Sequence, residues 1–316
     1  MNASIAPTVR TAFDRLIDYA GLFPPAKLPM EEAVAEYAAA QNGAASWVLG
    51  RFIVPASRIS EVARLWAERE AEPLALAVIV DASLEPRLWF ASLQGALAEV
   101  AGVRASAPSV RIAALEIPLP APSSVRETLD APIGQLRASL DRASLQDVPG
   151  YVELPRVRWR ESLPGAMTAL ARMRLSAKLR CGGVVADAFP PPDDVAAFVA
   201  AAAAANVAFK ATAGLHHPVR HVDPATGFVM HGFLNLLAAA TFAPRAGVDL
   251  LAEIVAEEDP GSFGLDDLSL RWRDQRASLD DVARMRASAF HGYGSCSFSE
   301  PVEDLTALRL LPAAAV

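Results

Sequence analysis

Short apolar runs alternate with amphipathic segments along almost the whole chain. Runs of strand length begin near residues 16, 46, 74, 110, 150, 175 and 207. Segments with helical periodicity lie between them, such as 30–43, which ends in the Asn-Gly pair that commonly stops a helix. Strands and helices that alternate in this way predict βαβ units around a parallel sheet.

Seven such units without a break in composition predict a closed (β/α)8 TIM barrel, and an eighth strand should follow. Residues 268–272 and 291–298 are the candidates. We prefer the second, because a proline and a final helix follow it, as a last βα unit requires. Residues 221–290 then form an enlarged connection after strand seven, within a single domain of residues 1–316. A connection of this length is typically a lid or an oligomer contact, and a homodimer through it is a hypothesis.

Composition narrows the class of protein. Alanine raises the hydrophobic content to 53% and the mean hydropathy to +0.25, but the alanine-rich uncharged run 195–209 is shorter than the ~20 residues of a membrane span. Two cysteines without a CxxC pair, and a start unlike a signal peptide, predict a cytoplasmic, reduced protein in which Cys181 and Cys296 are small buried side chains. A net charge of -7 without basic clusters argues against nucleic acid as a partner.

Lysine is almost absent from the chain. Of 29 basic residues only Lys27, Lys178 and Lys210 are lysines. The last two fall in strands six and seven, near the strand ends where barrels carry their chemistry. Because arginine cannot supply a deprotonatable amine, these lysines indicate a chemical role. The two lysines lie on adjacent strands with backbones ~5 Å apart, so their ammonium groups should repel each other. The repulsion should lower the pKa of one lysine and leave it a nucleophilic amine.

Other polar residues occupy predicted strand ends, which converge on one mouth in a barrel. Glu116 and Glu153 each lie two residues before a proline, and Asp81 ends strand three. We expect either glutamate to shuttle protons, and His216 or His217 to act as acid or base. The substrate is expected to be a small molecule, and an anionic one would depend on local arginines. The candidate substrate-binding residues at the mouth are Arg51, Arg180, Gly182, Gly183, Thr212, Gly214, Arg220 and Ser295.

Three stretches resemble a known family: Lys178-Leu-Arg-Cys-Gly, then Phe209-Lys210-Ala-Thr-Ala-Gly214, and the late Gly294-Ser295-Cys296-Ser297. They are similar to strands six to eight of class I aldolases of the deoxyribose-phosphate aldolase type. The resemblance implies that Lys178 forms a Schiff base, that Lys210 lowers its pKa, and that the late loop binds a phosphate. It implies a carbon–carbon lyase that needs no cofactor.

The histidines support an alternative, since four of the five fall between residues 216 and 231. His216, His217 and His231, with Glu116 or Glu153, could bind zinc or another divalent metal and serve a metal-dependent hydrolase or lyase. The same mouth could perform enolisation without a covalent adduct. A second alternative is a non-catalytic barrel that acts as a binding subunit.

Overall fold

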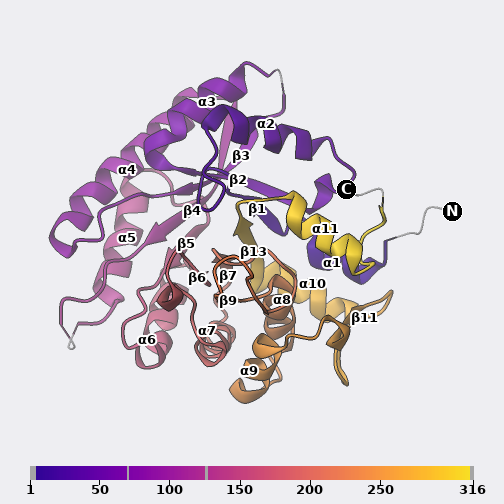
Figure 1. The fold of residues 1–316 in the computed structure, drawn as a ribbon. Coiled ribbons are helices and arrows are strands. Elements are labelled where there is room, and N and C mark those ends of the chain that lie inside the picture. Colours follow the sequence, from indigo (N-terminus) through magenta and orange to yellow (C-terminus); the bar gives the residue numbers. More distant parts are fainter. Residues whose placement is uncertain (1–4, 70, 125–126, 314–316) are drawn as a thin grey trace.

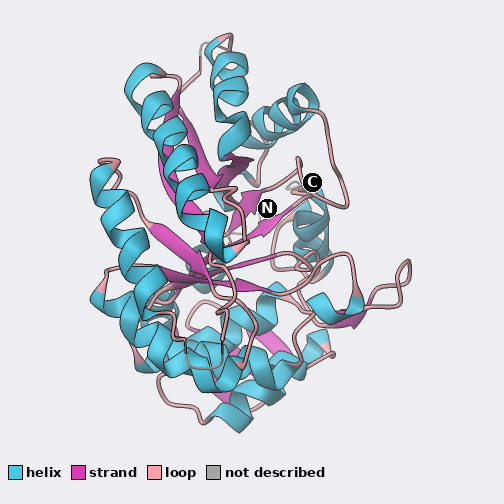
Figure 2. Cartoon of the chain, turned by 90° about the vertical axis from the view of Figure 1, so that its left-hand side faces the viewer, coloured by secondary structure: helices cyan, strands magenta, loops and turns pink. Residues whose placement is uncertain are grey.

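Eight parallel strands close into a barrel in the order β1-β13-β7-β6-β5-β4-β3-β2. The structure is a computed structural model that describes residues 5–69, 71–124 and 127–313. Figures 1 and 2 show the strands inside a ring of helices. The prediction of a (β/α)8 barrel is therefore confirmed. The barrel strands are β1 (Ile17–Tyr19), β2 (Leu49–Pro55), β3 (Leu74–Ile79), β4 (Val110–Pro118), β5 (Gly150–Glu153), β6 (Ser176–Arg180), β7 (Phe209–Thr212) and β13 (Phe290–Ser295).

A helix follows each barrel strand except β7, where the connection is enlarged. Local sequence explains where these helices begin: α7, for example, starts at a proline and carries Asp193 and Asp194 in its first turn, close to the positive end of the helix dipole. None of the helices in the described part of the chain is long and apolar enough to cross a membrane. The helices outside the enlarged connection are α1 (Pro7–Phe13), α2 (Met30–Gln41), α3 (Ile59–Ala67), α4 (Pro86–Ser106), α5 (Asp130–Arg142), α6 (Trp159–Arg172), α7 (Pro192–Ala204) and α11 (Ser299–Ala307).

The connection between β7 and β13 is a structured unit that builds the barrel wall. All ten residues of its first helix, α8, are buried, because α7, α9, α10 and β13 pack around it. Its role as a lid or an oligomer contact stays a prediction. Its elements are β8 (His221–Val222), β9 (Val229–Met230), α8 (Phe233–Phe242), α9 (Val248–Ala256), β10 (Phe263–Leu265), β11 (Ser269–Trp272), β12 (Gln275–Ser278) and α10 (Leu279–Ser288).

The structure settles which segment is the eighth barrel strand. β13 pairs in parallel with both β1 and β7 and so closes the barrel, as expected for residues 291–298. The other candidate, 268–272, lies in the separate antiparallel sheet β10-β11-β12. Several strands are shorter than the apolar runs that predicted them. β1 has three residues, since the chain turns soon after Tyr19 towards α2.

The barrel interior has an apolar side and a charged side. Ile53, Ala77, Ala114 and Tyr151, with Ala20, form a small buried cluster that is separate from the main core between strands and helices. β6 and β7 instead contribute Lys178 and Lys210 to the interior. Three of the five residues on the apolar side are alanines, which leave space for long charged side chains that reach across from the other strands.

Candidate active site in the barrel interior

Lys178 and Lys210 are register partners on the neighbouring strands β6 and β7. Their side chains are only 2% and 1% exposed. A buried ammonium group is costly unless an opposite charge pairs with it. The barrel supplies such charges from three other strands, so the two lysines become the centre of a buried ionic network.

Glu116 of β4 lies between the two lysines and is fully buried. Its Oε2 is 2.7 Å from the Nζ of Lys178, and its Oε1 accepts a hydrogen bond from the Nζ of Lys210. β4 and β7 are not neighbours in the barrel, so this second contact crosses the interior. Burial alone would raise the pKa of Glu116, but the two ammonium groups outweigh it and lower the pKa to about 2.

Two further carboxylates complete the pairing of the lysines. Lys210 donates a hydrogen bond to Oδ2 of Asp18 at 2.6 Å, and the Nζ of Lys178 lies 3.1 Å from Oε2 of Glu153. Burial lowers the pKa of Lys210, but Asp18 and Glu116 outweigh it, so the pKa is raised. Repulsion between the lysines, which was expected to lower the pKa of one of them, therefore does not lower that of Lys210, because a carboxylate lies between the two cations.

The network continues from Lys178 to the carboxyl-terminal mouth of the barrel. Arg180, the last residue of β6, donates a hydrogen bond to Oε1 of Glu153 at 2.7 Å. The exposed fraction rises along this path from 2% for the Lys178 side chain to 17% for Glu153 and 48% for Arg180. Burial would raise the pKa of Glu153, but Lys178 and Arg180 outweigh it and hold the pKa below its ordinary value. Arg180 is therefore a cation within reach of a ligand.

Small or apolar residues also lie at the carboxyl-terminal ends of the barrel strands. Thr212 ends β7 and is the register partner of Arg180. Phe23 and Ile79 are partly buried and pack on the apolar interior cluster. Gly182 and Gly214 approach so closely that a Cβ on Gly182 would lie 3.0 Å from the Cα of Gly214. These glycines allow the loops after β6 and β7 to meet.

The structure places some predicted site residues outside the mouth. A Cβ on Gly183 would lie 2.7 Å from that of Ala188, so Gly183 packs within its own loop. Asp81 accepts hydrogen bonds from the backbone and the hydroxyl of Ser57. The Nε of Arg220 lies 3.3 Å from Oε1 of Glu258. Asp81 and Arg220 therefore have partners outside the lysine network.

Arg51 belongs to the network, but not at the mouth. It is the third residue of β2, in the amino-terminal half of the strand, and its Nη1 lies 3.3 Å from Oδ2 of Asp18. In the same region, the hydroxyl of Tyr151 and the Nδ1 of His291 are 2.7 Å apart. The prediction that Arg51 faces the mouth is wrong, because its position in β2 directs it to the other end of the barrel.

His216 and His217 face α11 and have no part in the lysine network. His216 Nδ1 lies 3.0 Å from Oε2 of Glu300, and His217 Nδ1 lies 2.6 Å from Oδ2 of Asp304. The loop after β7 turns outwards to α11, so the expectation that both histidines share a pocket with the lysines is not met. Ser295 is buried at the end of β13, where its Oγ accepts a bond from the backbone N–H of Ser297.

The three histidines of the metal hypothesis do not converge. His231 is buried, and its Nε2 lies 2.7 Å from the carbonyl oxygen of Pro190, whereas His216 and His217 contact α11. Burial lowers the pKa of His231 to about 4. Within residues 5–69, 71–124 and 127–313, no group of three histidine, cysteine, aspartate or glutamate side chains is placed to hold a metal ion.

Sequence analysis missed Asp18 and Tyr151 as parts of this interior. Asp18 is the one charged residue in an apolar strand of the sequence LIDYAGL, which was an available signal. Tyr151 gave no signal, since tyrosine is common in strands. The network has three carboxylates and four cations: Asp18, Glu116 and Glu153, with Arg51, Lys178, Arg180 and Lys210.

Comparison with known proteins identifies no family for this chain. It matches no protein-family model and no curated protein. Among solved structures, a xylose isomerase-like TIM barrel protein from Mycobacterium smegmatis in complex with magnesium aligns with a TM-score of 0.41 and 12% identity, over 92% of this chain and 91% of that chain. The assignment of the fold rests on the strand pairing described above.

Proposed function

We propose that this protein is an aldolase-like lyase in which Lys178 forms a Schiff base with a small, anionic carbonyl compound. The observation that supports the proposal best is the buried, in-register lysine pair. Each lysine contacts two carboxylates, but only one of these four contacts, that of Lys178 with Glu153, leads directly to Arg180 at the mouth.

Lys178 is the better nucleophile of the two because of its position. Lys210 contacts Asp18 and Glu116, both almost fully buried, so a proton from Lys210 would have to pass through Glu116 and Lys178 to reach the mouth. Lys178 contacts Glu153, which is partly exposed and can exchange its proton with the substrate side. Lys210 then serves as a fixed positive charge beside Glu116.

An anionic group on the substrate fits the charge of the site. The network contains one more cation than carboxylate, although the whole chain carries a net charge of -7. Among the described residues, Arg180 pairs with one carboxylate, that of Glu153, and its side chain is about half exposed. Its planar fork can bind a carboxylate or phosphate by two parallel hydrogen bonds, and the hydroxyl of Thr212 lies on the neighbouring strand.

Binding of that anion starts the reaction. The substrate anion takes the place of Glu153 on Arg180, and Glu153 loses one of the two cations that lower its pKa. Glu153 then accepts a proton from the Nζ of Lys178, and the neutral amine attacks the carbonyl carbon. Glu153 returns the proton to the departing hydroxyl, which leaves as water, and a protonated imine forms.

The imine then allows a carbon–carbon bond to break. Its positive nitrogen withdraws the electron pair of the bond between the α and β carbons, while Glu153 takes the proton of a hydroxyl on the β carbon. An aldehyde leaves, and Glu153 gives the proton to the α carbon of the remaining enamine. Water hydrolyses the imine and restores Lys178.

Reductive trapping tests the proposal. The protein is incubated with a panel of small aldehydes and 2-oxo acids, reduced with borohydride, and mapped by peptide mass. We expect a reduced adduct on Lys178 with at least one 2-oxo acid, and none on Lys210. Lys178→Arg should abolish the adduct, while Lys27→Arg, which changes the exposed third lysine, should leave it unaltered.

Two results would contradict Schiff-base chemistry at this site. One is a wild-type protein that is labelled at Lys27 alone with every carbonyl compound. The other is a Lys178→Arg variant with an unchanged circular dichroism spectrum that still forms the adduct in full yield. Turnover of a carbonyl compound without any trapped adduct would favour enolisation by the same carboxylates.

A further inference from the structure

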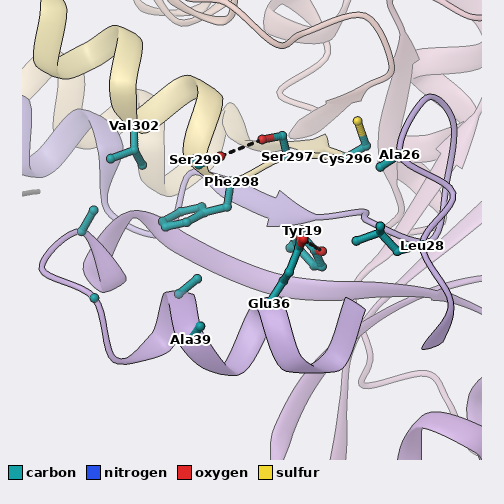
Figure 3. Close-up of a pocket in the computed structure, with 13 residues that line it drawn as sticks. Tyr19, Ala26, Leu28, Glu36, Ala39, Cys296, Ser297, Phe298, Ser299 and Val302 are labelled. Atoms are coloured by element: carbon teal, nitrogen blue, oxygen red, sulfur yellow. Dashed lines mark hydrogen bonds between the residues drawn. The ribbon is translucent and has the colours of Figure 1, made fainter. Parts of the chain in front are cut away.

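A cavity lies between α2 and α11 (Figure 3). Its volume is about 480 Å³. It is at the carboxyl-terminal face of the barrel, since its lining includes Tyr19, the last residue of β1, and Cys296, the first residue after β13. The hydroxyl of Tyr19 donates a hydrogen bond to Glu36 of α2 at 2.6 Å. Most other lining residues are apolar: Ala26, Leu28, Ala39, Ala40, Phe298 and Val302.

Cys296 at the edge of this cavity belongs to a cluster of ionisable groups. Its Sγ lies 3.8 Å from Nε2 and 3.9 Å from Nδ1 of His216, and Nδ1 of His216 is 3.0 Å from Oε2 of Glu300. The three residues come from the loops after β13 and β7 and from α11. An imidazole beside the thiol, with a carboxylate beside the imidazole, is the arrangement that makes a cysteine a nucleophile.

The charges around the cluster favour an imidazolium at His216. The hydrogen bond to Cys296 and the carboxylate of Glu300 raise the pKa of His216 to about 9, against burial, which lowers it. Tyr19 and Glu36 face Cys296 from the cavity side. Burial and the bond to Glu36 raise the pKa of Tyr19, so its phenol stays protonated.

The other cysteine has none of these features. Cys181 is fully buried after β6, and burial raises the pKa of its thiol. Cys296 is 8% exposed and lines a cavity. The chain therefore contains its own reference thiol, in the same protein and under the same conditions.

We propose that Cys296 is the nucleophile of a second site, in which His216 and Glu300 hold it as a thiolate and the cavity binds a small, uncharged α,β-unsaturated carbonyl compound. The apolar walls suit an uncharged ligand, and a thiolate, being a soft nucleophile, adds to conjugated carbon. This site does not depend on Lys178 and would exist whether or not Lys178 forms a Schiff base.

The addition is balanced without an oxidant or a leaving group. The sulfur of Cys296 forms a bond to the β carbon, and the electron pair of the carbon–carbon double bond moves to the α carbon. His216 donates its proton there, so that S–H has been added across the double bond. Reversal of the same steps releases the ligand.

Maleimides, which are uncharged conjugated carbonyl compounds, are the probes for the test. The full-length protein is treated with N-ethylmaleimide at pH 6.5, and the labelling of each cysteine is followed by peptide mass against glutathione in the same tube. We expect Cys296 to react at least about tenfold faster than glutathione, whose thiol is mostly protonated at this pH, and Cys181 to stay unlabelled in the folded protein.

Two neighbouring histidines provide matched variants. His216→Gln should lower the labelling rate of Cys296 to about that of glutathione, while His217→Gln, whose imidazole faces Asp304, should leave it within about twofold. Equal effects of the two variants, or wild-type labelling no faster than glutathione, would overturn the thiolate at Cys296.

The role of the cavity is tested separately by ligand size. Cys296 should be labelled faster by N-phenylmaleimide than by N-ethylmaleimide, and by a larger ratio than glutathione is, because the apolar walls of the cavity bind the phenyl ring. Ala39→Phe, at an exposed position of α2 that lines the cavity, should remove this preference. A preference that is absent in the wild type, or unchanged in this variant, would overturn the binding of the ligand in this cavity.

Discussion

The barrel interior and the rim beside α11 both contain groups of ionisable side chains, but the two regions stabilise charge differently. Inside, Lys178 and Lys210 are almost completely buried, and each contacts two carboxylates within 3.1 Å. At the rim, the imidazole of His216 is 16% exposed and lies 3.8 Å or more from the sulfur of Cys296. A charge far from water needs complete pairing, whereas water supplies part of the stabilisation near the surface.

This difference predicts how each region responds to change. In the interior, removal of one charge leaves its partners buried without compensation, so stability and chemistry should fail together. At the rim, proton transfer between neighbours costs little, so reactivity should change while the fold is kept. Four measurements, from the largest expected effect to the smallest, test this contrast.

Glu116→Gln should have the largest effect. It keeps the shape of the side chain but removes the carboxylate that both lysines contact, so the free energy of unfolding should fall by about 3–5 kcal/mol. Urea unfolding measures this loss. Glu61→Gln, in the half-exposed pair with Arg58, is the control and should change stability by less than about 0.5 kcal/mol. Equal stabilities of the two variants would show that the interior pairing contributes little.

Arg180→Gln should weaken the binding of anionic substrates without unfolding the protein. The loss of a charge-assisted pair of hydrogen bonds should raise the concentration of 2-oxo acid that gives half-maximal trapping by about 10- to 100-fold. Trapping of uncharged aldehydes should change little. Arg156→Gln alters an arginine that donates to the carbonyl oxygen of Ala188 and serves as the control. The same loss for acids and aldehydes would exclude a specific role of Arg180 in anion binding.

Acid should weaken the interior at Glu153. Lys178 and Arg180 outweigh burial and hold its pKa below the ordinary 4.5, so its contribution to stability is present above that value and is lost as the pH falls through the lower folded pKa. Urea unfolding of the wild type and Glu153→Gln between pH 7 and 3 should give a difference that shrinks in acid. If the difference in unfolding free energy instead grew as the pH fell, a lowered pKa of Glu153 would be contradicted.

Alkali should weaken the rim, through a smaller effect at His216. The bond to Cys296 and the charge of Glu300 raise its pKa from 6.5 to about 9, so the stability that it contributes is complete below pH 6.5 and is lost as the pH rises through about 9. The difference in unfolding free energy between the wild type and His216→Gln should be about 1 kcal/mol at pH 6. It should disappear by pH 10, and persistence at that pH would contradict an imidazolium at this position.

Much of the architecture could be predicted because it depends on local patterns. The period of apolar residues predicted strands and helices, and their alternation predicted the barrel. A strand followed by a proline and a terminal helix identified residues 291–298 as the last barrel strand, which the structure places at Phe290–Ser295. Strand ends were less predictable. β1 is much shorter than its apolar run, because hydropathy does not show where the chain leaves the sheet.

The lysine pair was predictable because adjacent parallel strands fix which residues are neighbours, and Lys178 and Lys210 occupy matching positions. The electrostatics of the pair was not. Whether two ammonium groups repel or share a carboxylate depends on side chains from β4, β1 and β5, which lie up to 192 residues away from the lysines in the sequence. Glu116 lies between them and, together with Asp18, raises the pKa of Lys210.

The histidines show the same limit. His216, His217 and His231 are close in sequence, yet His231 is buried against Pro190 and the other two face α11. Sequence alone determined the barrel, the order of its units and the position of the lysines, because these follow from hydrophobic periodicity and strand register. Only the tertiary structure decided which charges meet. Barrel closure brings together side chains from strands that are distant in the chain, and some of these side chains meet across the barrel interior.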